Sequence, residues 1–89
     1  MPRKPIQEWE RRRGLALGSL LVKRRNTLAR SAEHVAVEAE ISVETIRRLE
    51  RGQIPNPGVF TVAALSRALG LGMDELLGPL ESKRKWRKK

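Results

Sequence analysis

Residues 31–52, SAEHVAVEAEISVETIRRLERG, predict two short helices joined by a tight turn. Ser31 and Ser42 stand where a hydroxyl group can accept a hydrogen bond from a free backbone N–H at the start of a helix. The first segment carries an apolar stripe on one side, made of Val35, Ala36 and Ala39. The second segment ends at Gly52, because glycine adopts the left-handed conformation after a helix at the lowest cost.

The second of these helices has two different faces. Ile46 and Leu49 form its inward side, whereas the opposite side is charged and carries Glu44, Arg47, Arg48 and Arg51. A helix that reads the major groove of DNA needs such a buried stripe and an outward row of hydrogen-bonding side chains, and arginine suits bidentate contacts with guanine or phosphate. The alternative is an ordinary helical bundle on which this row is only a solvated charged face.

Four segments extend the pattern beyond this stretch. In chain order they are LGSLLVKRR (17–25), SAEHVA (31–36), ISVETIRRLERG (41–52) and NPGVFTVAALSRALGLGMDELL (56–77). From Leu17 to Leu77 the chain thereby resembles the helix-turn-helix family of lambdoid phage repressors and Cro proteins, the XRE family. The resemblance implies an all-α, repressor-like bundle of five helices, in which the second and third helices form the DNA-binding unit.

The resemblance also implies roles for individual residues. The side chains that would face base edges or lie beside them are Val43, Glu44, Thr45, Arg47 and Arg48. Those that would contact the DNA backbone are Ser31, Ser42, Arg51, Gln53, Asn56, Arg24 and Arg30. Arg25 and Glu50 stand where the family often has an arginine–glutamate pair that links the first helix to the third, so we expect a structural pair there.

Three of the backbone contacts have a second interpretation. Arg24 and Arg30 flank the end of the first helix, where a favourable interaction with a helix C-terminus is the alternative to a phosphate contact. Asn56 is also placed to cap the next helix, with Pro57 as the first helical residue.

The chain departs from the family pattern at three positions. Ala32 replaces the usual glutamine, whose amide braces a phosphate, and Arg30 stands where an apolar residue is common. Glu40 replaces the usual glycine of the turn. A glutamate there either adopts the less favoured left-handed conformation or belongs to a turn that is built differently.

The composition is that of one small helical domain. The 89 residues show no strand-like alternation, and the absence of cysteine excludes disulfides and cysteine-based metal sites. His34 is the only histidine, and no glycine-rich phosphate loop is present. We therefore expect neither catalysis nor a metal or other cofactor.

The net charge of +9 is concentrated at the two ends. Residues 1–13 form a basic N-terminal extension with five basic and two acidic side chains, residues 14–80 form the nearly neutral helix-turn-helix domain, and residues 81–89 form a basic C-terminal tail. We expect the tail to add sequence-independent affinity for DNA through counterion release. Its cations are Lys83, Arg84, Lys85, Arg87, Lys88 and Lys89.

The segment before residue 25 predicts a helix with a break. Gly14 and Gly18 weaken one continuous helix, so we expect an extra helical turn or two, and then a helix from about Leu15. The apolar run LALGSLLV (15–22) forms its buried side, being too short for a membrane span and lacking a cleavage site for a signal peptide. The absence of such targeting signals favours a location of the protein in the cytoplasm. Trp9 is interpreted as a packing residue rather than as a stacking partner for a base.

Residues 59–69 predict the clearest amphipathic helix, which Gly70 ends. Its expected packed face consists of Val59, Val62, Ala63, Leu65, Ser66 and Leu69. A short last helix follows at residues 73–77. Some of its leucines, together with Leu80, either face a second subunit or belong to the core.

These features favour a sequence-specific, double-stranded DNA-binding transcriptional regulator, a repressor that binds a near-palindromic operator as a homodimer with the 43–51 helix in the major groove. One alternative is an antitoxin, a module whose protein partner is a toxin and whose DNA binding is autoregulatory. Another is a non-specific nucleic-acid binder driven by the basic arms. Polymerase is a further candidate protein partner. We expect no membrane partner and no small-molecule effector, because 89 residues leave no room for a sensing domain.

Overall fold

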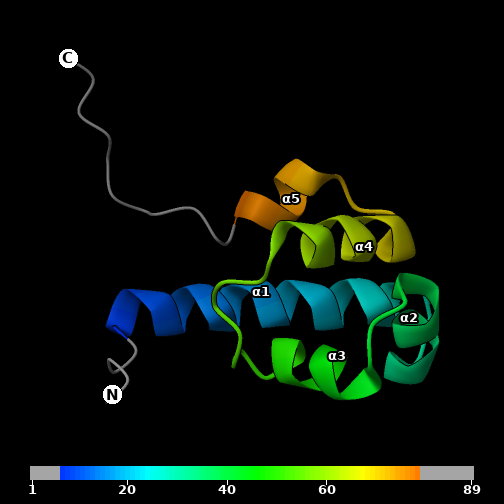
Figure 1. Cartoon of the computed structure of the whole chain (residues 1–89), viewed down its shortest axis with the longest axis horizontal. Helices are drawn as coiled ribbons and strands as arrows, with labels where there is room; N and C mark the ends of the chain where they lie inside the picture. Colours follow the sequence, from blue (N-terminus) through cyan, green and yellow to red (C-terminus); the bar gives the residue numbers. More distant parts are fainter. Residues whose placement is uncertain (1–6, 79–89) are drawn as a thin grey trace.

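Five helices are formed by residues 7–78, the part of the chain that the computed structural model describes. They are α1 (Glu8–Thr27), α2 (Ala32–Ala39), α3 (Val43–Glu50), α4 (Val59–Leu69) and α5 (Met73–Leu77). The long α1 runs through the middle, with α3 along one side and α4 and α5 along the other, and α2 lies across the end of this arrangement (Figure 1). The expected all-α bundle of five helices is confirmed. The expectations for Leu80 and the cations of the tail fall outside the described residues.

The core is aliphatic, and every helix contributes to it. The side chains that are least exposed are Leu17, Val35, Ile46, Leu49, Leu65, Leu69 and Leu76. The stripes predicted in residues 31–52 are buried in full, since Val35, Ala36 and Ala39 of α2 pack together with Ile46 and Leu49 of α3. Both helices of this unit therefore bury one side and leave the other side in solvent.

Each of the helices α2 and α3 begins at a serine cap, and a strained turn connects the two helices. Ser31 accepts a hydrogen bond from the N–H of His34 at 3.0 Å, and Ser42 accepts one from the N–H of Thr45 at 3.1 Å, as the sequence predicts. Glu40 takes the left-handed alternative, with φ of 58°. A left-handed conformation costs a residue with a side chain roughly 1–2 kcal/mol, so this turn is held by the packing on either side of it.

The first helix corrects one expectation. α1 runs without a break through Gly14 and Gly18, so the predicted interruption is wrong. A Cβ atom on Gly14 would lie 2.6 Å from the carbonyl oxygen of Gly52, and one on Gly18 would lie 2.5 Å from that of Glu50. The glycines therefore permit a close approach between α1 and the end of α3, and this packing outweighs their low helix propensity of about 1 kcal/mol each.

The start of α4 corrects two more expectations. The helix begins at Val59 with Gly58 as its N-cap, so Asn56 does not cap it. The side-chain oxygen of Asn56 instead accepts a hydrogen bond from Arg13 of α1. Val59 is 63% exposed rather than packed, and the buried side of α4 is completed by Ala64 and Ala68.

The last helix divides its leucines between core and surface. Leu76 is fully buried, whereas Leu77 is 38% exposed. Among the described residues, no helix has the length and apolar character that a membrane crossing requires.

Replacing a central leucine of α4 tests this packing. Leu65 is 1% exposed, so we expect Leu65→Ala to lower the free energy of unfolding by about 2–5 kcal/mol, measured by chemical denaturation. Arg67→Ala is the matched control on the same helix, because Arg67 is exposed and its replacement should change stability by less than about 0.5 kcal/mol. Equal losses for the two variants would contradict the described position of α4.

Candidate nucleic-acid interface

The outward side of α3 carries the charged row that the sequence predicts. Glu44, Arg47, Arg48 and Arg51 are exposed on it, while Ile46 and Leu49 hold the other side in the core. Val43 and Thr45 are half-buried at the start of the helix. The predicted base-contacting residues thus belong to one exposed helix with a fixed back, as a reader of the major groove requires.

The start of α3 is held by more than its cap. The hydroxyl of Ser42 donates a hydrogen bond to Oγ1 of Thr45 at 2.9 Å, in addition to accepting one from the backbone of the same residue. These bonds fix the first turn of the helix. The Thr45 hydroxyl retains a proton with which it can bond to a base edge or a phosphate.

The end of α3 is tied to α1 by the arginine–glutamate pair that the resemblance implies. Nε and Nη2 of Arg25 donate to the two carboxylate oxygens of Glu50 at 2.7 and 3.1 Å, and Nη1 donates to the carbonyl of Arg30 at 2.9 Å. The two side chains are only 19% and 13% exposed. The hydrogen bond that Arg25 donates to Glu50 raises the pKa of Arg25 above its ordinary value, because the carboxylate favours the charged guanidinium. The pair therefore sets how α3 lies on α1.

Arg47 makes a contact that the sequence did not reveal. Its guanidinium forms an ion pair with Glu33 in the first turn of α2, with 2.5 Å between Nη2 and the carboxylate oxygen. The partners are 14 residues apart and on different helices, so no periodicity in the chain connects them. Arg47 therefore leans toward α2, whereas the neighbouring Arg48 is exposed on the outward face.

Arg24 and Arg30 bind the end of α4. Nε of Arg24 donates to the carbonyl of Leu69 at 2.8 Å, and Nη1 of Arg30 donates to the carbonyl of Ala68 at 2.7 Å. The alternative to phosphate contacts, an interaction with a helix C-terminus, is thus observed, but the helix is α4, which the sequence did not indicate. It also accounts for an arginine at position 30, because its guanidinium satisfies the end of another helix.

The remaining predicted backbone contacts lie at the two ends of the unit. Ser31 caps α2, and Arg51 is the C-cap of α3. Gln53 is exposed in the loop after α3, as is Asn56, whose side-chain oxygen is bonded to Arg13. Ala32, where the family pattern has glutamine, is 9% exposed, so its methyl group packs against the core.

Comparison with known families agrees with this geometry. A family model for the helix-turn-helix domain matches residues 16–78, which is well over half of the chain. The chain therefore belongs to the helix-turn-helix domain family, whose members have DNA as their partner. No curated protein matches the chain.

Removing one partner of the pair between α1 and α3 should cost stability as well as binding. We expect Arg25→Ala to lower the free energy of unfolding by about 1–3 kcal/mol, because it leaves the carboxylate of Glu50 largely buried without its charged partner. Arg25→Lys should recover only part of the loss, since lysine cannot bond to both oxygens in the same way. Unchanged melting together with weaker DNA binding would identify Arg25 as a phosphate ligand instead.

The contact between Arg47 and Glu33 should restrain DNA binding. The two side chains are 46% and 62% exposed, and such exposed pairs contribute about 0–1 kcal/mol, so a phosphate can compete for Arg47. We expect Glu33→Gln to raise affinity for any duplex and to steepen the slope of log K against log salt by up to about 0.9.

Two further variants separate this restraint from a general charge effect. Glu38→Gln removes another carboxylate of α2. This carboxylate contacts His34 rather than Arg47. In an Arg47→Ala background, the gain from Glu33→Gln should shrink to that of Glu38→Gln. Equal gains from the two glutamine variants in the wild-type background would mean that the contact itself does not restrain binding.

Proposed function

We propose that this helix-turn-helix protein is a sequence-specific binder of double-stranded DNA that acts as a transcriptional repressor. It occupies a near-palindromic operator as a homodimer and excludes polymerase by occupying its site. The single observation that carries the proposal is the exposed row on α3, set on a helix whose other side is buried and whose two ends are tied down. The proposal includes no catalytic activity and places the protein in the cytoplasm.

Base recognition is divided among the residues of this row. Arg48 bonds to guanine through its guanidinium fork, a contact worth about 1–3 kcal/mol of discrimination. Glu44 accepts a hydrogen bond from the N4 amino group of cytosine, and its charge disfavours registers that bring it close to a phosphate. Val43 and Thr45 lie at the start of α3 beside these contacts. Arg47 serves the backbone, because its pairing with Glu33 draws it toward α2.

Exposed apolar side chains on α4 and α5 support the homodimer. Val59, Phe60 and Leu77 are 63%, 87% and 38% exposed, and the end of α5 lies beside the start of α4 (Figure 1). Apolar side chains that stay exposed on neighbouring helices are typical of surfaces that a partner covers. A second copy of the chain that covers them forms a two-fold dimer, and such a dimer reads two half-sites about one helical turn apart.

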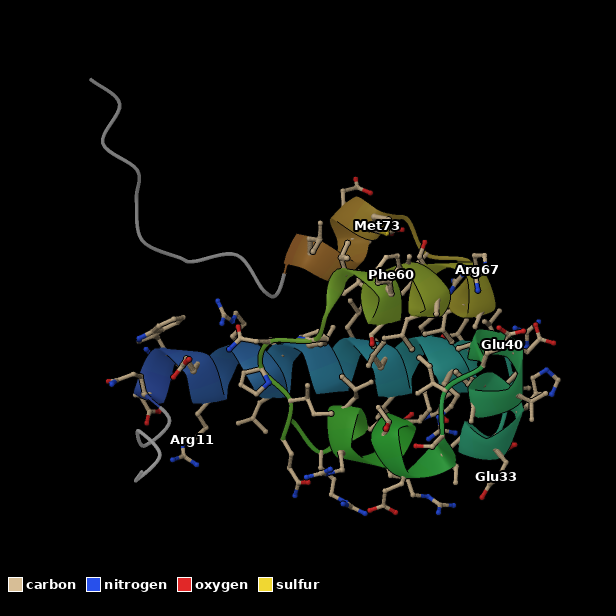
Figure 2. The ribbon with its side chains drawn as sticks, viewed as in Figure 1. Arg11, Glu33, Glu40, Phe60, Arg67 and Met73 are labelled. Atoms are coloured by element: carbon tan, nitrogen blue, oxygen red, sulfur yellow. The ribbon has the colours of Figure 1, made fainter. Side chains whose placement is uncertain are left out.

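Selection of bound duplexes from a random pool, at near-physiological salt and with the full chain, tests the proposal. We expect enrichment of an inverted repeat whose half-site centres lie about one helical turn apart. Arg48→Ala should then reduce affinity for the selected duplex by about 1–3 kcal/mol and relax the preference at one position of each half-site. Arg67→Ala is the matched control, because Arg67 is an exposed arginine on α4 rather than on α3 (Figure 2).

Other outcomes would contradict the proposal. Tight, salt-sensitive binding without enrichment of any sequence indicates a non-specific binder driven by the basic arms. Enrichment that appears only when a second small protein is added indicates a partner-dependent module, such as an antitoxin. Enrichment of single half-sites would retain the sequence reader and reject the dimer.

A further inference from the structure

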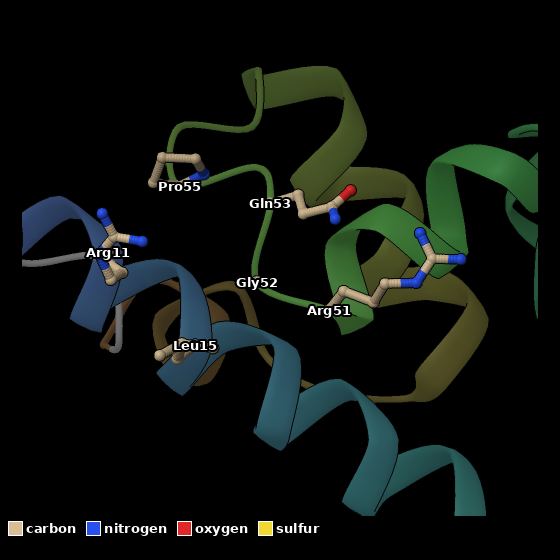
Figure 3. A pocket seen from close by; sticks show the side chains of 6 residues that line it. All are labelled: Arg11, Leu15, Arg51, Gly52, Gln53 and Pro55. Carbon is tan, nitrogen blue, oxygen red and sulfur yellow. The ribbon is translucent and has the colours of Figure 1, made fainter. Parts of the chain in front are cut away.

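A basic pocket lies next to the end of α3, between the first turns of α1 and the loop that follows α3 (Figure 3). It is open to solvent and has a volume of about 260 Å³. The residues that line it are Arg11, Leu15, Arg51, Gly52, Gln53 and Pro55. Two of them belong to α1, and the others run from the C-cap of α3 into the loop.

The two walls of this pocket are held together by specific contacts. Gly14 allows α1 to touch the backbone of the loop, since a Cβ atom there would lie 2.6 Å from the carbonyl oxygen of Gly52. The residue directly before Gly14 is Arg13, which hydrogen-bonds to Asn56 and also lies over the ring of Trp9, with 4.7 Å between Cζ and the ring centroid. The pocket is therefore part of the fold rather than a chance gap between two mobile segments.

One wall of the pocket is an addition to the matched family domain. The family match begins at residue 16, whereas α1 begins at Glu8. Arg11 and Leu15 both lie in the turns that precede the match. The lining residues of the other wall, from Arg51 to Pro55, lie inside the matched domain. The ligand of this pocket would therefore be bound jointly by the family domain and by the helical extension of this chain.

The chemistry of the lining is that of a site for an anion with an apolar part. Arg11 and Arg51 place one arginine on each side of the pocket, and Gln53 supplies an amide. The side chain of Arg51 extends away from that of Arg11 (Figure 3). Leu15, which is 52% exposed, and Pro55 supply an apolar floor. No carboxylate is among the lining residues. A sugar phosphate matches this combination, with the phosphate on the cations and the sugar on the apolar floor.

The position of the pocket agrees with a nucleic-acid backbone. Arg51 directly follows α3, so the pocket continues the charged row of that helix. Arg11 extends from α1 toward the side on which α3 lies, as does Glu33 at the other end of the unit (Figure 2). The ion pair of Arg11 with Glu8 is long, at 3.9 Å, and both side chains are at least 60% exposed, so a phosphate can replace it.

We propose that this pocket binds one phosphodiester unit of the DNA backbone, with Arg11 as its main contact and with Arg51 able to turn toward it from the opposite rim. The first turns of α1 thereby extend the DNA contact beyond the matched domain, on the side of α3 away from α2. The inference rests on DNA binding as the proposed function. It does not require sequence specificity, because a phosphate contact fixes position and carries no base preference.

Salt titrations of DNA affinity test the role of Arg11 in the full chain. We expect Arg11→Gln to weaken binding to selected and to scrambled duplexes by the same factor, and to reduce the slope of log K against log salt by about 0.9, the value of one lost phosphate contact. Arg12→Gln is the matched control, because Arg12 is an exposed arginine on the same helix that does not line the pocket. It should change the slope by clearly less. Equal changes for the two variants would overturn the proposal.

A second variant acts on the opposite wall without changing an arginine. Gln53→Glu is close to isosteric and lies in an exposed loop, so the fold should tolerate it, and thermal unfolding verifies this. The new carboxylate lies at the rim of the same pocket, so we expect DNA affinity to fall several-fold in the wild type and to fall less in the Arg11→Gln background. Full additivity of the two changes would show that they do not share a ligand.

A titration with small phosphates decides between DNA and a free phosphorylated compound. The probes are inorganic phosphate, thymidine monophosphate and a short duplex, and the signal is the side-chain amide resonance of Gln53 in the intact protein. We expect the duplex to shift this resonance at concentrations where the small phosphates do not. Saturation by the mononucleotide at micromolar concentration, with no shift caused by the duplex, would assign the pocket to a free nucleotide instead.

The failure of this proposal is distinguishable from the failure of the proposed function. If selection yields an operator and Arg11→Gln binds it with the wild-type affinity and slope, the pocket proposal is wrong and the sequence reader stands. If no sequence is selected but Arg11→Gln still flattens the slope on random DNA, the pocket proposal stands and the repressor does not.

Discussion

The close contact between α1 and the end of α3 is the constraint on which the rest of the structure depends. Gly14 and Gly18 bring the two backbones together, and the pair between Arg25 and Glu50 closes the same seam nearer the other end of α1. Backbone contact allows little sliding, and a bidentate ion pair allows little rotation. Once α3 is fixed in this way, Ile46 and Leu49 enter the core and the charged row faces outward.

The sequence predicts those features that depend on spacing within one element. The apolar stripes of α2 and α3, the serine caps and the glycine after α3 follow from helical periodicity and from hydrogen-bonding rules that act over three or four residues. The choice of family follows from the order of such local signals. The left-handed Glu40 could be given only as one of two alternatives, because the residue type disfavours it and only the surrounding packing enforces it.

The features that the sequence did not predict depend on contacts between distant elements. Glycine in α1 indicated a break when considered along the chain, and close packing when considered against α3. The ion pair of Arg47 with Glu33 joins two helices, and the bonds of Arg24 and Arg30 reach the end of α4. In each case a long, flexible cation selects its partner only after the helices have been placed. A row of arginines in a sequence therefore overstates how many of them are available to a ligand.

These assignments change how the positive charge of the DNA-facing side is distributed. On the α2 side, Ala32 is buried in place of a polar family residue, and Glu33 brings a carboxylate that occupies Arg47. On the α1 side, Arg51 and Arg11 lie on opposite sides of a pocket whose lining includes no carboxylate (Figure 3). The arginines that remain available to phosphates thus lie nearer the first turns of α1 than α2. A family member that lacks the usual anchor on one side of its recognition helix can hold the same register on DNA when a phosphate contact on the other side replaces it. In that interpretation, the first turns of α1 and the substitution of alanine at position 32 are two parts of one rearranged interface.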